Sequence, residues 1–467
     1  MKNLIYIFAD QLRYKSLGYS GDEKAMTPSI DAFSKESVNV CNAVSGHPVC
    51  APYRATLFTG KYTTSTGMVI NEIRLNTDHK TFAQVLNDNG YNTSYIGKWH
   101  IYANEFGNHF DPENSFIPKG DNRLGFNDYF AAYNFHHDYF GEHAYYHLDG
   151  PEKIFCHDYE PNVQTNMAME QLDDLKSKNK PFALFLSLGT PHDPWVTENV
   201  PPDYLEKFKN VDFELPLNYL PEDDKYADEW ARLYPEERAN LTQWMKCYYA
   251  MVNNLDDNIG RLIKKIKDIG LYDNSIIVFT SDHGELFGAH GRRAKNIFYE
   301  EAVRVPFLIR DGDLLKGKNT TTFNTVDIMP TMLSLMGMEN DIPMEVEGVN
   351  YSHNIKGNID SNEGSLMMGT GATAIFEDGH EWRAYRTNEY TYATYKVDGA
   401  EFLFNNIKDS YQTQNLAKDV EYSRVKESLK SKMYEKMRSI NDNFEKSSYY
   451  EKNWIENRII KEKTQLM

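Results

Sequence analysis

Short, mostly apolar runs alternate along this chain with longer stretches that are apolar on one side only. Each run has the length of a strand that is buried on both faces of a sheet. The longer stretches place apolar residues at helical spacing, as between Met251 and Ile266. This alternation predicts an α/β fold, with a large and mostly parallel sheet sandwiched by helices. The runs are residues 4–9, 182–188, 275–280 and 305–309 and the flanks of Tyr95.

The pattern changes after about residue 355. Residues 382–395 are rich in tyrosine and threonine, which predicts antiparallel strands, and Asp398-Gly399 is typical of a hairpin turn. Apolar residues from Val425 to Phe444 mark one face of a closing helix. We therefore expect a main domain at residues 1–355 and a smaller C-terminal α+β subdomain at 356–467, with an antiparallel sheet.

The charge balance argues against two classes of partner. The 467 residues include 50 basic and 68 acidic ones, for a net charge of -18. A field of that sign repels nucleic acid and anionic membrane surfaces, so an anionic substrate would need positive charge gathered in one pocket. The first apolar run is too short for a signal peptide, and no run is long enough to span a bilayer. We expect a cytoplasmic protein; its oligomeric state stays open.

Titratable side chains stand just after several of the predicted strands. In a parallel sheet such positions meet along one edge, where α/β proteins bind their ligands. The sequence therefore predicts an active site at that edge. The residues concerned are Asp10, Lys98, His100, His192, Asp282 and His283.

Two of these positions suit a metal ion. The pairs Asp10-Gln11 and Asp282-His283 together offer carboxylate, amide and imidazole ligands. That set is sufficient for one divalent cation such as Ca²⁺, Mg²⁺ or Mn²⁺. The alternative for an aspartate at a strand end is a helix cap or a turn residue.

Other polar residues suit an anion. Lys98 and His100 lie two apart on an extended segment and can face one ligand, unless Lys98 is simply solvated. His192 stands between two prolines, which suits a general acid held in place, although a loop histidine can also be without a role. Lys295 ends a basic cluster with Arg293 that either holds an anionic group or forms a solvated face.

Cys50 opens a predicted helix in the segment Cys50-Ala51-Pro52-Tyr53-Arg54. Amides at a helix N-terminus and a guanidinium both favour negative charge, so Cys50 is placed where a nucleophile would meet an anion. Residues 129–147 are rich in aromatic side chains and histidines. They suit either a sugar-binding platform or an aromatic core.

These motifs, taken in order, resemble those of the type I, formylglycine-dependent sulfatases of the alkaline phosphatase superfamily. The resemblance covers nearly the whole chain and runs through residues 10–11, 50–60, 97–100, 190–194 and 281–284. It implies an alkaline-phosphatase-like fold with residues 1–355 as the catalytic domain. It also implies a sulfuric ester hydrolase that acts on a small sulfated substrate, with a carbohydrate sulfate as the expected one.

The resemblance further implies roles for individual residues. A maturation enzyme would convert Cys50 to formylglycine, and one divalent metal, Ca²⁺ by preference, would be held by Asp10, Gln11, Asp282 and His283. Arg54 would steady the formylglycine hydrate, and Lys98 with Lys295 would neutralise charge on the sulfuryl group. His192 would protonate the leaving alcohol, and His100 would assist the release of sulfate.

Two departures from the family keep alternatives open. Tyr53 stands where members commonly have serine or threonine, which bears on the conversion of Cys50. Gln11 and His283 stand where many members have aspartate and asparagine, and a similar set occurs in phosphonate monoester hydrolases. The alternatives are a phosphonate monoester hydrolase or phosphodiesterase on the same scaffold, or a non-catalytic binding homologue in which Cys50 stays unconverted.

Overall fold

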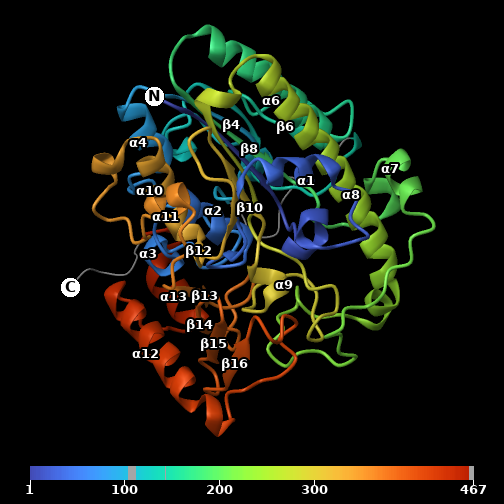
Figure 1. The fold of residues 1–467 in the computed structure, drawn as a ribbon, viewed down its shortest axis with the longest axis vertical. Coiled ribbons are helices and arrows are strands. Elements are labelled where there is room, and N and C mark those ends of the chain that lie inside the picture. The colour runs from blue at the N-terminus through green and yellow to red at the C-terminus, as the bar shows by residue number, and fades with distance from the viewer. Residues whose placement is uncertain (104–111, 142–143, 462–467) are drawn as a thin grey trace.

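The computed structural model describes residues 1–103, 112–141 and 144–461 (Figure 1). Its largest element is an eight-stranded sheet in the order β11-β2-β10-β9-β1-β8-β4-β5. Its strands are β1 (Asn3–Ala9), β2 (Val38–Val40), β4 (Asn92–Lys98), β5 (Tyr129–Tyr133), β8 (Phe182–Leu188), β9 (Ser275–Ser281), β10 (Phe307–Arg310) and β11 (Gly317–Asn319).

The centre of this sheet is parallel, as the sequence predicts. Strands β9, β1, β8, β4 and β5 run in one direction, whereas β10 is antiparallel to both β9 and β2. Ala9 at the end of β1 pairs with Leu188 of β8 on one side and Ser281 of β9 on the other. The carboxyl ends of these three strands therefore lie level with one another.

Helices cover both faces of the sheet. Leu4, Tyr6 and Phe8 of β1 pack in the same apolar core as α2 (Cys50–Thr59), α4 (Phe82–Asp88) and α10 (Thr325–Leu335). Ile5 and Ile7 pack on the opposite side with α1 (Pro28–Lys35), α6 (Glu160–Ser177) and α8 (Pro235–Asp268). Figure 1 shows the two helix layers on either side of the sheet. The central strands are buried on both faces of the sheet, which explains why their sequences are mostly apolar.

A smaller antiparallel sheet follows in the C-terminal part, as predicted. It consists of β13 (Ser365–Gly369), β14 (Trp382–Arg386), β15 (Tyr390–Tyr395) and β16 (Glu401–Asn405), with α12 (Ser423–Ser439) and α13 (Ser447–Trp454) beside it. Helix α12 ends before Ile440 and Phe444, because Asn441 and Phe444 adopt left-handed backbone angles, with φ of 54° each. Apolar side chains of this sheet share a core with Leu286 and Phe298. The division at residue 355 stays a prediction.

Short elements complete the fold. No helix in the described part of the chain is long and apolar enough to cross a bilayer. The helices are α3 (Thr63–Thr66), α5 (Pro112–Ser115), α7 (Pro202–Lys207), α9 (Glu300–Val303) and α11 (Ser352–Gly357). The strands are β3 (Ala43–Val44), β6 (Tyr145–Tyr146), β7 (Ile154–Phe155), β12 (Phe323–Asn324), β17 (Ile455–Glu456) and β18 (Ile459–Ile460).

Candidate active site

The predicted polar residues meet at the carboxyl edge of the large sheet. Asp10 follows β1, Asp282 and His283 follow β9, and Cys50 is the first residue of α2. One ligand atom from each of these four buried residues lies within 4.8 Å of all the others. Segments up to 273 residues apart in the chain thus converge on one point, because the ends of β1 and β9 are in register.

Arg54 holds this cluster together from inside α2. Its guanidinium is completely buried and donates to the Lys98 carbonyl oxygen at 2.6 Å and to the Ser187 hydroxyl at 2.7 Å. The other terminal nitrogen lies 3.5 Å from Asp10 Oδ2 and 3.6 Å from Asp282 Oδ2. A buried charge next to two buried carboxylates compensates for the water that all three have lost.

The nearby positive charges affect the pKa values of the two aspartates differently. Burial acts to raise the pKa of Asp10, but the positive charge of Lys98, together with that of Arg54, outweighs it and holds that pKa well below its usual range. Burial and the charge of Asp10 together raise the pKa of Asp282 to about 7. The second carboxylate is therefore under electrostatic stress that a bound cation would relieve.

Hydrogen bonds hold both Gln11 and His283 in place. The Nδ1–H of His283 donates to the Gly284 carbonyl oxygen at 3.1 Å, so that Nε2 presents a lone pair to the cluster. Gln11 adopts a left-handed φ of 65°, and the Tyr248 hydroxyl donates to its backbone carbonyl oxygen at 2.8 Å. These contacts fix the ring of His283 and the backbone of Gln11, two residues that the sequence predicts as ligands.

The donor set fits a divalent cation. Asp282 Oδ2 is buried and has no hydrogen-bond partner among the described residues, which is costly unless something else pairs with it. Two carboxylates, an amide oxygen and an imidazole nitrogen suit Ca²⁺, Mg²⁺ or Mn²⁺ better than a soft metal. With two negative charges, the set also matches the charge of such an ion.

Cys50 lies at the centre of the cluster but is not an activated thiol. Its sulfur is 3.2 Å from His283 Nε2, 3.5 Å from Lys295 Nζ and 3.8 Å from Lys98 Nζ. Burial and then the charge of Asp10 raise the pKa of the thiol to about 11. At neutral pH the thiol is therefore protonated and a poor nucleophile.

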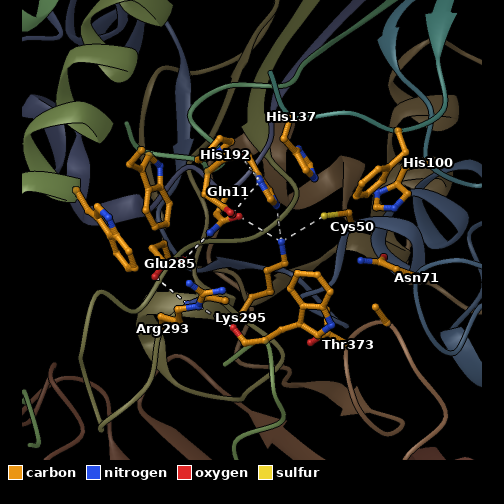
Figure 2. A pocket seen from close by; sticks show the side chains of 18 of the residues that line it. Gln11, Cys50, Asn71, His100, His137, His192, Glu285, Arg293, Lys295 and Thr373 are labelled. Atoms are coloured by element: carbon orange, nitrogen blue, oxygen red, sulfur yellow. Dashed lines mark hydrogen bonds and ion pairs between the residues drawn. The ribbon is translucent and has the colours of Figure 1, made fainter. Parts of the chain in front are cut away.

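The predicted lysines and His192 surround the same point, and Figure 2 shows the Lys295 side chain directed toward Cys50, Gln11 and His192. Lys98 Nζ lies 2.5 Å from Asp10 Oδ2, and Lys295 Nζ donates to Gln11 Oε1 at 3.2 Å. Lys295 also donates to His192 Nε2 at 2.7 Å. Burial and then Lys295 hold the pKa of His192 well below its usual range, so its ring is neutral. The His192 ring stacks on the ring of His137, with 4.0 Å between the two ring centroids.

His100 lines the cavity beside Cys50, in a left-handed conformation with φ of 58°. Neither ring nitrogen has a hydrogen-bond partner among the described residues, and Nε2 is 3.7 Å from Glu72 Oε1. Glu72 is also left-handed, with φ of 62°. Strained backbone at two neighbouring buried residues is more common at functional sites than elsewhere.

The members of the basic cluster Arg292, Arg293 and Lys295 have different partners in the structure. Arg292 is paired with Asp224 at 3.0 Å, and Arg293 is paired with Glu237 at 2.5 Å while facing the cavity. Lys295 is the member of this cluster that reaches Cys50.

A cavity of about 320 Å³ opens from Cys50 toward three tryptophans. Trp195 and Trp244 lie 5.7 Å apart between ring centroids, and Trp230 is half exposed. Phe135 and His137 of the predicted aromatic stretch also line this cavity, whereas Tyr133, Tyr139 and Tyr145 are buried in the core. The stretch is therefore divided between the cavity wall and the core, and its sugar-binding role stays a prediction.

Several residues that line the cavity were not predicted from the sequence. Glu285 follows the Asp282-His283 pair closely, and that spacing is a signal for it. The others come from loops and from α8, where no motif marks them. These residues include Asn71, Glu72, Trp230, Trp244, Glu285 and Thr373.

Comparisons with known proteins identify the family. The model described as Sulfatase matches residues 2–338, and the model described as N-sulphoglucosamine sulphohydrolase, C-terminal, matches residues 288–439. The first match covers well over half of the chain. The chain belongs to the sulfatase family. It is thus a sulfuric ester hydrolase, which confirms the predicted family and enzyme class.

Individual relatives align with this sulfatase along most of its length. An ulvan-active sulfatase of Formosa agariphila is 34% identical over 97% of this chain and 84% of the relative. An N-acetylglucosamine-6-O-sulfatase of Bacteroides thetaiotaomicron is 25% identical over 94% of this chain and 87% of that one. The solved structure of a Bacteroides fragilis sulfatase has a TM-score of 0.83 at 27% identity, covering 96% of this chain and 97% of that one.

The phosphonate hydrolases are more distant from this sulfatase. A phosphonate monoester hydrolase of Agrobacterium radiobacter has a TM-score of 0.71 at 18% identity, covering 94% of this chain and 96% of that one. A likeness at that identity shows the shared fold alone. Together the solved structures confirm the alkaline-phosphatase-like fold.

Arg54 provides a test of how this sulfatase stabilises its carboxylates. Replacing Arg54 with alanine leaves Asp10 and Asp282 buried with less opposing charge, so we expect a loss of about 3–5 kcal/mol in unfolding free energy. Denaturant unfolding in the presence of a metal chelator measures it. Arg424→Ala, an exposed site on α12, serves as the control and should change stability by less than about 0.5 kcal/mol. A similarly small effect for Arg54→Ala would contradict the proposed compensation.

Proposed function

We propose that this sulfatase removes sulfate from a small sulfated sugar, with a formylglycine made from Cys50 as its nucleophile and one divalent metal. The observation that carries the proposal is the position of Cys50. Its sulfur contacts Lys98, Lys295 and His283 at once and opens onto a cavity walled by tryptophans. An anionic group at this point meets two ammonium groups and a helix N-terminus.

Formylglycine fits this position better than the unmodified thiol does. The thiol is neutral and buried, so it would attack a sulfate ester poorly. Formylglycine supplies, as its hydrate, a hydroxyl that attacks sulfur, and the aldehyde is restored when sulfate leaves. Because Cys50 is only 1% exposed in the folded chain, a maturation enzyme would have to act before folding is complete. Such an enzyme is the one protein partner that we propose.

Asp10, Gln11, Asp282 and His283 would hold the metal. Three of them supply oxygen ligands, which favours Ca²⁺, with Mg²⁺ or Mn²⁺ as alternatives. A divalent ion at this point would act as a Lewis acid on a sulfate oxygen and lower the pKa of a bound hydroxyl. Asp282 Oδ2 accepts no hydrogen bond from the part of the chain that the structure describes, which supports this assignment.

The remaining residues would act on charge and protons. Lys98 and Lys295 would neutralise the negative charge on the sulfuryl oxygens, and Arg54 would steady the nucleophile from within α2. His192, which accepts a hydrogen bond from Lys295, would take up a proton when the anion arrives and pass it to the leaving alcohol. His100, whose two ring nitrogens make no hydrogen bond to the described residues, would accept the proton that is released as sulfate departs.

A sugar suits the rest of the cavity. Tryptophan rings at Trp195 and Trp244 offer flat apolar faces, and on the other side Asn71, Glu72 and Thr373 offer groups that bind hydroxyls. A cavity of about 320 Å³ is at the small end of the range for ligand pockets, which favours one sugar ring over a longer segment. Relatives active on ulvan and on N-acetylglucosamine 6-O-sulfate support the same class.

The ester class is tested by comparing two model substrates. Matured enzyme with Ca²⁺ should hydrolyse an aryl sulfate with a kcat/KM at least about tenfold above that for a matched aryl phosphodiester. It should also release sulfate from at least one member of a panel of sulfated monosaccharides, measured by chromatography of free sulfate. Faster turnover of the phosphodiester, with no sulfate released from any sugar, would favour the phosphonate hydrolase alternative.

The tryptophan wall has a separate test. Trp244→Ala should lower kcat/KM for a sulfated sugar about tenfold, because the ring loses a stacking surface. Tyr434→Ala, an exposed aromatic residue on α12, is the matched control and should leave this value unchanged. Equal kinetics for Trp244→Ala and the control would mean that the sugar binds elsewhere.

A further inference from the structure

Glu285 is a buried carboxylate that joins two parts of the site. It lies two residues after His283 and is completely shielded from solvent. Its Oε2 accepts from Gln11 Nε2 at 2.5 Å, and its Oε1 accepts from the backbone N–H of Ala294 at 2.8 Å and of Phe287 at 3.0 Å. Figure 2 shows Glu285 on the side of Gln11 that faces away from Cys50.

This contact decides which end of the Gln11 amide faces the cluster. A carboxylate can only accept hydrogen bonds, so the NH₂ group of Gln11 must point toward Glu285. The amide oxygen then points the opposite way, where it accepts from Lys295 Nζ at 3.2 Å. With the Glu285 carboxylate on one side and the Lys295 ammonium on the other, the Gln11 amide has a single favourable orientation.

The same carboxylate also fixes the backbone that carries Lys295. Ala294, which precedes Lys295, has a left-handed φ of 60°, and Phe287 has one of 48°. Both are strained for residues with a side chain, and both donate to Glu285 Oε1. One buried group thus holds a predicted metal ligand and the loop of a predicted sulfate-binding lysine.

We propose that Glu285 is a positioning residue that aims the Gln11 amide oxygen at the metal and holds Lys295 over the same point. The inference rests on the proposed function, in which Gln11 is a metal ligand. It explains why this chain has glutamine at position 11. An ionised carboxylate there would face Glu285 with like charge, whereas an amide offers a donor to Glu285 and an oxygen to the metal.

The pair makes a distinctive prediction for single substitutions. In Glu285→Gln, the amide oxygen of residue 285 must accept the two backbone N–H groups, so its NH₂ group faces Gln11. Gln11 then turns its oxygen toward residue 285 and its NH₂ group toward the metal. In Gln11→Glu, two carboxylates face each other. Each variant should weaken Ca²⁺ binding at least about tenfold.

The double variant Gln11→Glu/Glu285→Gln reverses the donor and the acceptor. The NH₂ group of residue 285 can donate to the new carboxylate, whose second oxygen faces the metal again. Ca²⁺ affinity should therefore return to within a few-fold of the original. Isothermal titration calorimetry of the metal-free, full-length protein with CaCl₂ measures all four proteins, and thermal unfolding in chelator shows that each is folded.

Asp256→Asn is the matched control. Asp256 is a buried carboxylate that accepts backbone N–H groups of Ile30 at 2.7 Å and Ser29 at 3.1 Å, outside the cavity. This substitution should lower stability but leave Ca²⁺ affinity unchanged. If Glu285→Gln does not fold, Gln11→Glu and the double variant still carry the comparison.

The outcomes separate this inference from the proposed function. Ca²⁺ affinity in Glu285→Gln equal to the original, or losses in the double variant that simply add, would overturn the positioning role while leaving the metal site intact. A starting protein that binds no divalent cation would overturn the metal site itself and this inference with it. Weakening in both single variants with recovery in the double variant is the result that we expect.

Discussion

The site is built on two carboxylates that lie close together and are completely buried. Asp10 and Asp282 reach the same point because β1 and β9 are paired in register, and neither can remain ionised there alone. Arg54 and Lys98 supply the opposing charge, and both depend on the fold for their positions. The start of α2, the end of β4 and the ends of the central strands must therefore all be correct at once.

This compensation also shapes the chemistry. Lys98, Lys295 and Arg54 place positive charge around a cavity in a chain whose net charge is -18. An anionic ester is attracted to that point and to few others on such a protein. Burial and the charge of Asp10 nevertheless raise the pKa of the Cys50 thiol and keep it protonated, so the residue at the centre of the site is unsuited to attack in its encoded form. The proposed conversion of Cys50 to formylglycine would resolve that conflict.

The sequence predicted the parts of the site that follow strand ends, because a parallel sheet converts strand order into proximity. Asp10, Lys98, Asp282 and His283 belong to this group. It could not predict Trp230 or Trp244, since the packing of a loop and of α8 over the cavity depends on contacts distant in sequence. The role of Glu285 likewise requires the loop that returns Ala294 to it. Tyr53, the departure from the family pattern, packs in the core with its hydroxyl 3.5 Å from that of Tyr6.

The state of residue 50 is the most direct test of this account. The mass of the peptide that contains this residue should be measured on protein from its natural host, in several preparations that differ in specific activity toward a sulfate ester. The account predicts an aldehyde in place of the thiol, in a fraction that rises in proportion to activity. Full sulfate release from preparations in which residue 50 is an intact thiol throughout would contradict it.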